Sequence, residues 1–340
     1  YLSRSNYAPY RNFALEARKD PTNAYIDYLK NILLLNISDV GSPYWRGRGI
    51  SSERIKKTET LSDLLKIVGE GDTTLLERED GFVKAYMPKG VRLDDLYSSS
   101  SSGTTGNPKT IYHSLVPLTT SALNEAFGIK EQIGYDEIRR LEGTKLLALG
   151  PKGAYQKELE ELAKMFKMEY VNLGFNTAGL KKLSPEEMMM RISPVVARAN
   201  EELQKGGIGL LTASKEAIPW LGDLKRVKIV KLSGTGIDFK TIRRYEETYP
   251  EVYFIPSYGH YAAMSSIGII RNSKIVYFPS WPFSYFPVHD GHDFVRYSRK
   301  GDILMILAHP EFLLIKRDDR GIRERPQNPF SFDGVSDISR

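Results

Sequence analysis

The most informative run in the sequence is Tyr97-Ser-Ser-Ser-Ser-Ser-Gly-Thr-Thr-Gly-Asn-Pro-Lys109-Thr110. Its many hydroxyl groups do not suit a core, because each buried hydroxyl would need a hydrogen-bond partner. A flexible serine linker explains Ser98–Ser102 alone, but not the two glycines that bracket two threonines, nor Pro108 and Lys109. Glycines let backbone N–H groups converge on an anion, hydroxyls add donors, and lysine supplies a positive charge. The run therefore predicts a phosphate-binding loop. Pro108 stands where a Walker motif needs its second glycine, so the loop is not that of a P-loop NTPase.

The pattern of apolar residues changes on either side of this loop. Before it, helical spacing at 24–33 and 61–68 is followed by a strand-like stretch, Leu75–Met87. After residue 110, apolar strands alternate with helices, which is typical of βαβ units, and beyond residue 264 only β runs separated by turns remain. The sequence thus predicts an α/β fold in three stretches: an N-terminal helical and β segment (1–97), an α/β nucleotide-binding core (98–264) and an antiparallel β unit leading to a hinge (265–340).

Four local signals add detail to this outline. Ser184-Pro-Glu-Glu187 predicts a capped helix start, and Pro194 predicts a kink or an interruption of the helix that follows. The stretch 238–249 is expected to be helical, and Arg317-Asp-Asp-Arg320 predicts a turn.

Composition narrows the class of protein. The 340 residues include no cysteine, so disulfides, thiolate zinc sites and cysteine nucleophiles are excluded. A net charge of +6 suits polyanionic small molecules, and no nucleic-acid-binding motif is present. No apolar run reaches the roughly 18–20 residues that span a bilayer, and no basic-then-apolar leader follows Tyr1. These features predict a cytoplasmic protein without nucleic-acid or membrane partners.

Four segments together carry a resemblance to a known family. Ser102–Lys109 resembles the signature loop of the acyl-adenylate-forming superfamily, which includes acyl-CoA synthetases, adenylation domains and luciferase. The family's later segments follow in order: Val227–Gly236 resembles the strand and glycine turn beside adenine, Pro256–His260 the Tyr-Gly segment under the nucleotide, and Lys300–Asp302 the Gly-Asp whose carboxylate takes the ribose hydroxyls. The match covers roughly residues 95–340. It is most similar to the phenylacetate–coenzyme A ligase branch, with this chain as the large N-terminal domain.

The resemblance implies an AMP-forming ligase that activates an aryl or acyl carboxylic acid with Mg²⁺-ATP. The acid attacks the α-phosphate to give acyl-adenylate and pyrophosphate, and a thiol, coenzyme A or that of a carrier protein, then takes the acyl group. Its implied site residues fall into three groups. Those stabilising charge on the phosphates are Lys109, Thr104 and Thr105; those binding the nucleotide are Ser101, Ser102, Gly103, Gly106, Gly234, Thr235, Gly236, Ser257, Tyr258, Gly259 and Asp302; those near the acid are His260 and Tyr261. No protein ligand for a metal is predicted, and a homodimer is left open.

Two departures from the family pattern leave alternatives. Ala262 stands where the family has a glutamate that helps to hold Mg²⁺, and Val335 stands where it has an arginine, which Arg323 or Arg325 could replace. The chain also stops at Arg340, before the family's small C-terminal domain with its catalytic lysine, so slow adenylation is expected of this chain alone. The alternatives are a catalytically impaired subunit that binds a nucleotide or acyl-adenylate, and activation for transfer to a protein partner.

The remaining histidines and aromatic residues favour structural roles. His289 and His292 flank Asp290-Gly291, which could hold a metal but is more typical of a polar turn. His113 follows the loop on a strand and is expected to be structural. The aromatic stretch Trp281–Pro287 could form an acyl or partner surface, but aromatics beside prolines usually pack a loop.

Overall fold

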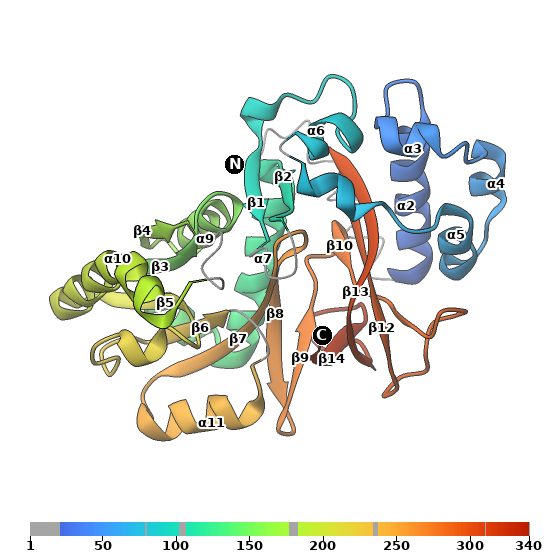
Figure 1. The fold of residues 1–340 in the computed structure, drawn as a ribbon. Helices are drawn as coiled ribbons and strands as arrows, with labels where there is room; N and C mark the ends of the chain where they lie inside the picture. The colour runs from blue at the N-terminus through green and yellow to red at the C-terminus, as the bar shows by residue number, and fades with distance from the viewer. Residues whose placement is uncertain are drawn as a thin grey trace. The chain divides into compact units, whose positions relative to one another are not determined.

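The computed structural model describes residues 21–78, 80–101, 107–176, 183–233, 237–309 and 311–339. The chain divides into two compact units, one formed by residues 1–96 with 280–340 and the other by residues 97–279 (Figure 1). We call them unit 1 and unit 2. The three-part division predicted at residues 97 and 264 stays a prediction.

Unit 2 is built on a mixed sheet in the order β9-β8-β7-β6-β5-β3-β4. Strands β4, β3, β5, β6 and β7 run parallel, while β8 and β9 continue the sheet antiparallel to their neighbours. A separate antiparallel hairpin precedes them. Its strands and those of the sheet are β1 (Tyr97–Ser100), β2 (Thr110–His113), β3 (Lys145–Pro151), β4 (Glu169–Phe175), β5 (Ile208–Ser214), β6 (Ile229–Ser233), β7 (Tyr253–His260), β8 (Met264–Arg271) and β9 (Lys274–Phe278).

Helices cover both faces of this sheet. The crossover from β3 to β4 moves along the sheet in the opposite direction to those from β4 to β5 and from β6 to β7, so right-handed crossovers place their helices on opposite faces. One face carries α9 with α7, which contacts both α9 and β8; the other carries α10 and α11 (Figure 1). The helical segments are α7 (Leu115–Ile133), α8 (Tyr135–Arg139), α9 (Ala154–Met165), α10 (Pro185–Lys205), η4 (Ile218–Trp220) and α11 (Phe239–Thr248).

Unit 1 packs short helices against an antiparallel sheet in the order β10-β12-β13-β14, with β11 also paired to β12. Helix α2 contacts β12 and β13, and the indole of Trp45 donates to the carbonyl of Leu313 over 2.7 Å. Its elements are α2 (Pro21–Ile37), α3 (Pro43–Gly47), α4 (Ser52–Lys57), α5 (Leu61–Val68), η1 (Thr73–Glu77), α6 (Gly81–Ala85), η2 (Leu93–Asp95), β10 (Ser284–Tyr285), β11 (Val288–His289), β12 (Lys300–His309), β13 (Phe312–Glu324) and β14 (Gly334–Ser339). Among the described residues, no helix combines the length and the apolar character needed to cross a membrane.

The predicted α/β fold is confirmed, and so are several of its local signals. Ser184 caps α10 in a full capping box with Glu187, and Asp238 caps α11 by accepting from the backbone N–H of Thr241. The predicted interruption at Pro194 is wrong, because α10 continues through it. Proline cannot donate to the carbonyl of residue 190, but the hydroxyl of Ser193 donates to it over 3.3 Å and satisfies that acceptor.

Two other local predictions are wrong. The stretch Leu75–Met87 is not a strand but the 3₁₀ turn η1 followed by helix α6, and Phe82 and Tyr86 are both buried at helical spacing. Residues 317–320 are not a turn but lie inside the long strand β13. Their charges are accommodated there because the facing strand β12 places Asp302 opposite Arg320.

Candidate functional site

The β1–β2 hairpin holds the two ends of the predicted phosphate loop together. The backbone N–H of Ser101 donates to the carbonyl of Lys109 over 2.9 Å, and the N–H of Lys109 donates to the hydroxyl of Ser101 over 2.8 Å. The predicted site residues Ser102, Gly103, Thr104, Thr105 and Gly106 between them lie outside the described residues. The hairpin therefore fixes where the predicted loop begins and ends.

The hairpin is anchored to the carboxyl end of β3 through the start of α9. Gly153, the residue before α9, has a φ of +84°, and an added Cβ there would stand 2.2 Å from the carbonyl oxygen of Ser98. Only glycine combines this backbone conformation with so close an approach. The ammonium of Lys157 in α9 also lies 5.7 Å from the ring centroid of Tyr97. The base of the hairpin thus lies at the edge of the sheet where the parallel strands end.

Two more predicted segments follow the ends of neighbouring parallel strands at this edge. Strand β6 ends at Ser233, directly before Gly234, Thr235 and Gly236, which lie outside the described residues. In β7, Pro256 is paired with Leu232 of β6, so Ser257, Tyr258 and Gly259 begin where the parallel pairing ends. Ligands of open α/β sheets bind at the carboxyl ends of the strands. The structure therefore brings to one edge of unit 2 the strand ends that flank two of the predicted segments, together with the Tyr-Gly segment of β7.

The residues at the end of β7 differ in exposure. The hydroxyl of Ser257 is buried, whereas Gly259 is exposed and an added Cβ there would meet nothing within 4 Å. On the other face, the ring of Tyr258 is stacked on His260 with centroids 6.5 Å apart, and it lies 6.0 Å from Tyr277. A ligand can therefore approach the backbone of Gly259 closely. The ring of Tyr258 is held by its contacts with His260 and Tyr277.

His260 is oriented by its own turn. Its Nδ1 accepts the backbone N–H of Ala262 over 3.1 Å, and its ring lies 4.6 Å from that of Tyr261. Because Nδ1 accepts, the neutral ring carries its proton on Nε2. His260 and Tyr261 are both half-buried at the end of β7, and their predicted contact with the acid stays a prediction.

The fourth predicted segment belongs to unit 1. Asp302 lies on β12, and each of its carboxylate oxygens faces an arginine of β13: Arg317 at 3.2 Å and Arg320 at 3.3 Å. Arg317 also pairs with Glu70 at 3.3 Å. The predicted ribose acceptor is therefore a carboxylate held in place by two guanidinium groups.

A buried group of charges lies behind the edge of unit 2, and the sequence analysis missed it. Lys231 on β6 is paired with Glu125 of α7, and Glu158 of α9 accepts the hydroxyls of Ser121 and Ser265, the latter over 3.1 Å. All five side chains are buried, the three charged ones completely. One oxygen of Glu125 accepts no hydrogen bond from the described residues. A signal was present, since each charged residue stands at an apolar position of its strand or helix.

Burial changes the protonation of this charged cluster (Glu125, Glu158 and Lys231). Loss of solvent, helped by the nearby Glu125 carboxylate, raises the pKa of Glu158 to about 8. Burial lowers the pKa of Lys231, but its attraction to Glu125 outweighs that effect, so the pKa lies above the ordinary value. At neutral pH the cluster therefore holds Lys231 charged and Glu158 protonated.

The departures from the family pattern are visible in the structure. Ala262 is fully buried and offers no carboxylate. Val335 of β14 is also buried and lies opposite Arg323 of β13, whose side chain is paired with Asp333 at 2.8 Å. Among the described residues, no group of three or more His, Cys, Asp and Glu side chains could hold a metal ion. Neither Ala262 nor Val335 therefore supplies the charge that the family pattern has at its position.

The structural roles expected for the other histidines and aromatic residues are confirmed. His113 is a buried residue of β2. The backbone N–H groups of His292 and Asp293 both donate to Asp290, which makes 289–293 a polar turn. Trp281 is buried and stacks on Phe332, with ring centroids 5.6 Å apart.

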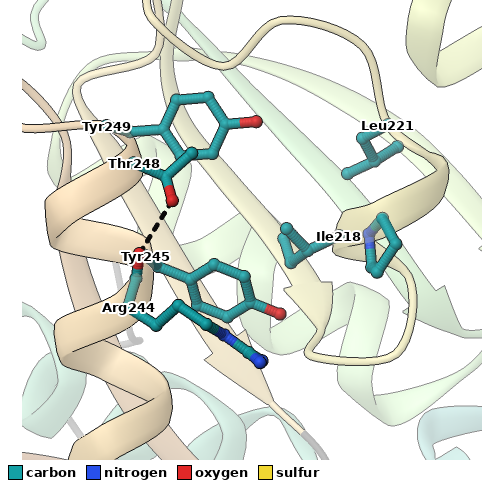
Figure 2. A pocket seen from close by; sticks show the side chains of 7 residues that line it. Ile218, Leu221, Arg244, Tyr245, Thr248 and Tyr249 are labelled. Carbon is teal, nitrogen blue, oxygen red and sulfur yellow. Dashed lines mark hydrogen bonds between the residues drawn. The ribbon is translucent and has the colours of Figure 1, made fainter.

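A separate hollow of about 360 Å³ opens on the α11 side of unit 2 (Figure 2). Ile218, Pro219 and Leu221 form one wall, and the last turn and a half of α11 forms the other. In that wall the hydroxyl of Thr248 donates to the carbonyl of Arg244 over 2.8 Å, so it is satisfied within the helix (Figure 2). The hollow contains none of the predicted site residues.

Comparison with known proteins identifies the fold. No protein-family model and no curated protein matches the sequence. Among solved structures, a 2-hydroxyisobutyryl-CoA ligase in complex with 2-HIB-AMP and CoA has a TM-score of 0.64 at 14% identity, over 94% of this chain and 68% of that one. Two further structures are similar. A luciferase-like enzyme of the nonluminescent mealworm Zophobas morio has a TM-score of 0.45 at 16% identity, over 82% of this chain and 63% of that one. The anthranilate CoA ligase AuaEII in complex with anthranoyl-AMP has a TM-score of 0.44 at 13% identity, over 71% of this chain and 46% of that one. The fold that the four sequence segments predict is thereby confirmed.

Proposed function

We propose that this protein, which has the fold of the AMP-forming ligases, binds ATP at the carboxyl edge of unit 2 and activates a carboxylic acid. The observation that carries the proposal is the meeting at that edge of the β1–β2 hairpin and the ends of β6 and β7. A loop rich in hydroxyls and glycines, next to a glycine turn and an exposed Gly259, suits a nucleotide phosphate chain.

The chemistry proposed is transfer of an adenylyl group. An oxygen of the carboxylate attacks the α-phosphorus, the bond to pyrophosphate breaks, and acyl-adenylate forms. A thiol, which we propose is that of coenzyme A, then attacks the acyl carbon and releases AMP. Lys109 and the hydroxyls of the loop would stabilise charge on the phosphates, Tyr258 would lie against adenine, and Asp302 would accept the ribose hydroxyls. Mg²⁺ would arrive bound to the ATP phosphates.

The test is the effect of Lys109→Ala on two nucleotides. Because the ammonium should act on phosphates that AMP lacks, the variant should bind ATP about 10- to 100-fold more weakly and AMP nearly as well as the wild type. Isothermal titration calorimetry measures both affinities. Lys130→Ala is the matched control, since Lys130 lies near the far end of the 19-residue helix α7. Equal ATP affinity of the Lys109→Ala and wild-type proteins would rule out the phosphate role.

A second candidate function is nucleotide binding without turnover. The observation that favours it is the buried Ala262 at the place of the metal-binding glutamate. ATP–pyrophosphate exchange with a panel of aryl and aliphatic acids separates the two functions. Exchange with any acid supports the ligase, whereas tight ATP binding without exchange supports the binding protein.

A further inference from the structure

Tyr155 lies across the carboxyl edge of the unit 2 sheet. An added Cβ on Gly150, near the end of β3, would stand 2.4 Å from the Tyr155 ring. The Tyr155 hydroxyl lies 3.4 Å from Oγ of Ser233, the last residue of β6. Because β5 lies between β3 and β6, the ring bridges over one strand. Its side chain is half-buried and lies between the buried Lys231 and the solvent.

The charged cluster contacts the Tyr155 ring through Lys231. Lys231 is two residues before Ser233 on the same face of β6, and its ammonium lies 5.7 Å from the centroid of the Tyr155 ring. A buried ammonium under an aromatic face is attracted to it. Lys231 is in turn held by Glu125, and Glu158 lies one turn after Tyr155 on α9. The position of the ring is therefore set by α7, α9 and β6 together.

Stability alone does not explain this arrangement. Removing an ammonium and a carboxylate from water costs several kcal/mol each, and apolar residues of the same size are often as stable or more so. A buried ion pair can instead fix the orientation of the groups that contact it. Tyr155 links this cluster to Ser233, which precedes the predicted adenine turn, because its ring lies against the Lys231 ammonium and its hydroxyl lies 3.4 Å from Oγ of Ser233.

We propose that Tyr155 is a positioning residue of the nucleotide site. Its hydroxyl donates to Ser233, which itself donates to the carbonyl of Ala213 over 3.4 Å, and so holds the Ser233 side chain at the end of β6, directly before residues 234–236. The ammonium of Lys231 lies against this ring, and Gly150, which has no side chain, leaves room for it. This inference rests on the proposed function, because the 234–236 turn is the predicted place of adenine.

A double-mutant cycle tests the proposal. Tyr155→Phe keeps the ring and loses its hydroxyl, and Ser233→Ala removes the partner. If Tyr155 acts through Ser233, each single variant binds AMP about 3- to 10-fold more weakly, and the double variant binds no more weakly than either. Calorimetry gives the dissociation constants, and thermal unfolding checks that each variant melts within a few degrees of the wild type.

Tyr170→Phe is the matched control. The Tyr170 hydroxyl donates to the carbonyl of Gln156 in the same helix over 2.8 Å, but Tyr170 lies on β4, away from β6. This variant should bind AMP as the wild type does. Unchanged AMP affinity of Tyr155→Phe, or effects of Tyr155→Phe and Ser233→Ala that simply add, would overturn the positioning role and leave the proposed function standing. A wild-type protein that binds no AMP would overturn both.

Discussion

Asp302 combines a predicted contact with the ribose and two observed ion pairs with arginines. From the sequence, it is predicted to accept the ribose hydroxyls. In the folded chain, Arg317 and Arg320 already contact its two oxygens, and both arginines are more exposed than Asp302 itself. Each carboxylate oxygen has more than one lone pair, so it can accept a hydroxyl while it stays paired. The two arginines would then hold the carboxylate in one orientation.

This geometry gives a prediction for Asp302→Asn. Loss of the carboxylate should weaken ATP binding about 10-fold and abolish the preference for ATP over 2′-deoxy-ATP, because hydrogen bonds to charged groups contribute about 1.5–3 kcal/mol. Stability should change by less than about 1 kcal/mol, since the ion pairs are partly exposed. Competition calorimetry with both nucleotides measures the preference. Asp337→Asn, which removes a 3.1 Å pair with Lys300 in the same unit, is the control. A preference unchanged in Asp302→Asn would disprove the ribose role.

Charged residues account for most of what sequence reasoning missed at the residue scale. Lys231, Glu125 and Glu158 occupy apolar positions, and periodicity alone treats them as exceptions to a buried pattern. Their partners come from α7, α9 and β6, more than 30 residues apart in sequence, so the ion pair appears only when the sheet is assembled. The turn predicted at Arg317–Arg320 is wrong for the same reason, because the partner of these charges, Asp302, lies on the facing strand and is distant in sequence.

At the scale of elements, Glu158 ties the stability of the α7–α9–β6 layer to pH. The folded chain keeps a proton on Glu158 up to about pH 8, whereas the unfolded chain releases it near the ordinary pKa of 4.5. Between these values the folded state binds more protons than the unfolded state. The free energy of unfolding therefore falls as pH rises, by up to about 1.4 kcal/mol per pH unit from this group.

Glu158→Gln should remove this dependence. Its stability relative to the wild type should rise steadily between pH 5 and 8, as measured by urea unfolding at several pH values. Glu160→Gln on the same helix is the control, because contacts with Lys164 and Lys157 lower the pKa of Glu160 and leave it ionised throughout this range. A constant difference between Glu158→Gln and wild type would show that Glu158 is already ionised at pH 5.

The elements themselves were largely predictable where one face or both faces are apolar. The strands of the parallel sheet, the capped starts of α10 and α11 and the β runs after residue 264 follow from period and capping residues alone. The strand predicted at Leu75–Met87 is wrong because the apolar residues of this stretch fit the period of a helix as well as that of a strand. Helix α10 continues through Pro194 because the hydroxyl of the preceding serine compensates for the missing donor, which a rule for proline alone does not include, and the predicted kink there stays a prediction.

At the scale of the molecule, the predicted site residues are divided between the two units. Unit 2 contains the hairpin and the ends of β6 and β7, and unit 1 contains Asp302. The order of the four segments along the sequence could not show this division, because unit 1 is assembled from the two ends of the chain.

The division predicts the behaviour of a fragment. Residues 97–279 form a compact unit with its own sheet and helices and should fold alone. The fragment should bind AMP and 2′-deoxy-AMP equally, whereas the whole chain should prefer AMP by about 10-fold. Circular dichroism tests folding, and calorimetry tests binding. Ribose preference in the fragment would assign that role to a residue of unit 2.

The assembly of unit 1 from both ends of the chain also affects folding during synthesis on the ribosome. Helix α2 buries Tyr25, Leu29 and Leu33 in a unit whose strands β12 and β13 are synthesised more than 200 residues later. At roughly 5–20 residues per second, the apolar face of α2 would wait on the order of 15–60 s for those strands. Ribosome-bound chains arrested at residue 279 should therefore lose their first 96 residues to protease, and chains released at full length should keep them. Until β12 and β13 have been synthesised, the exposed apolar face of α2 is expected to bind a chaperone that shields apolar helices.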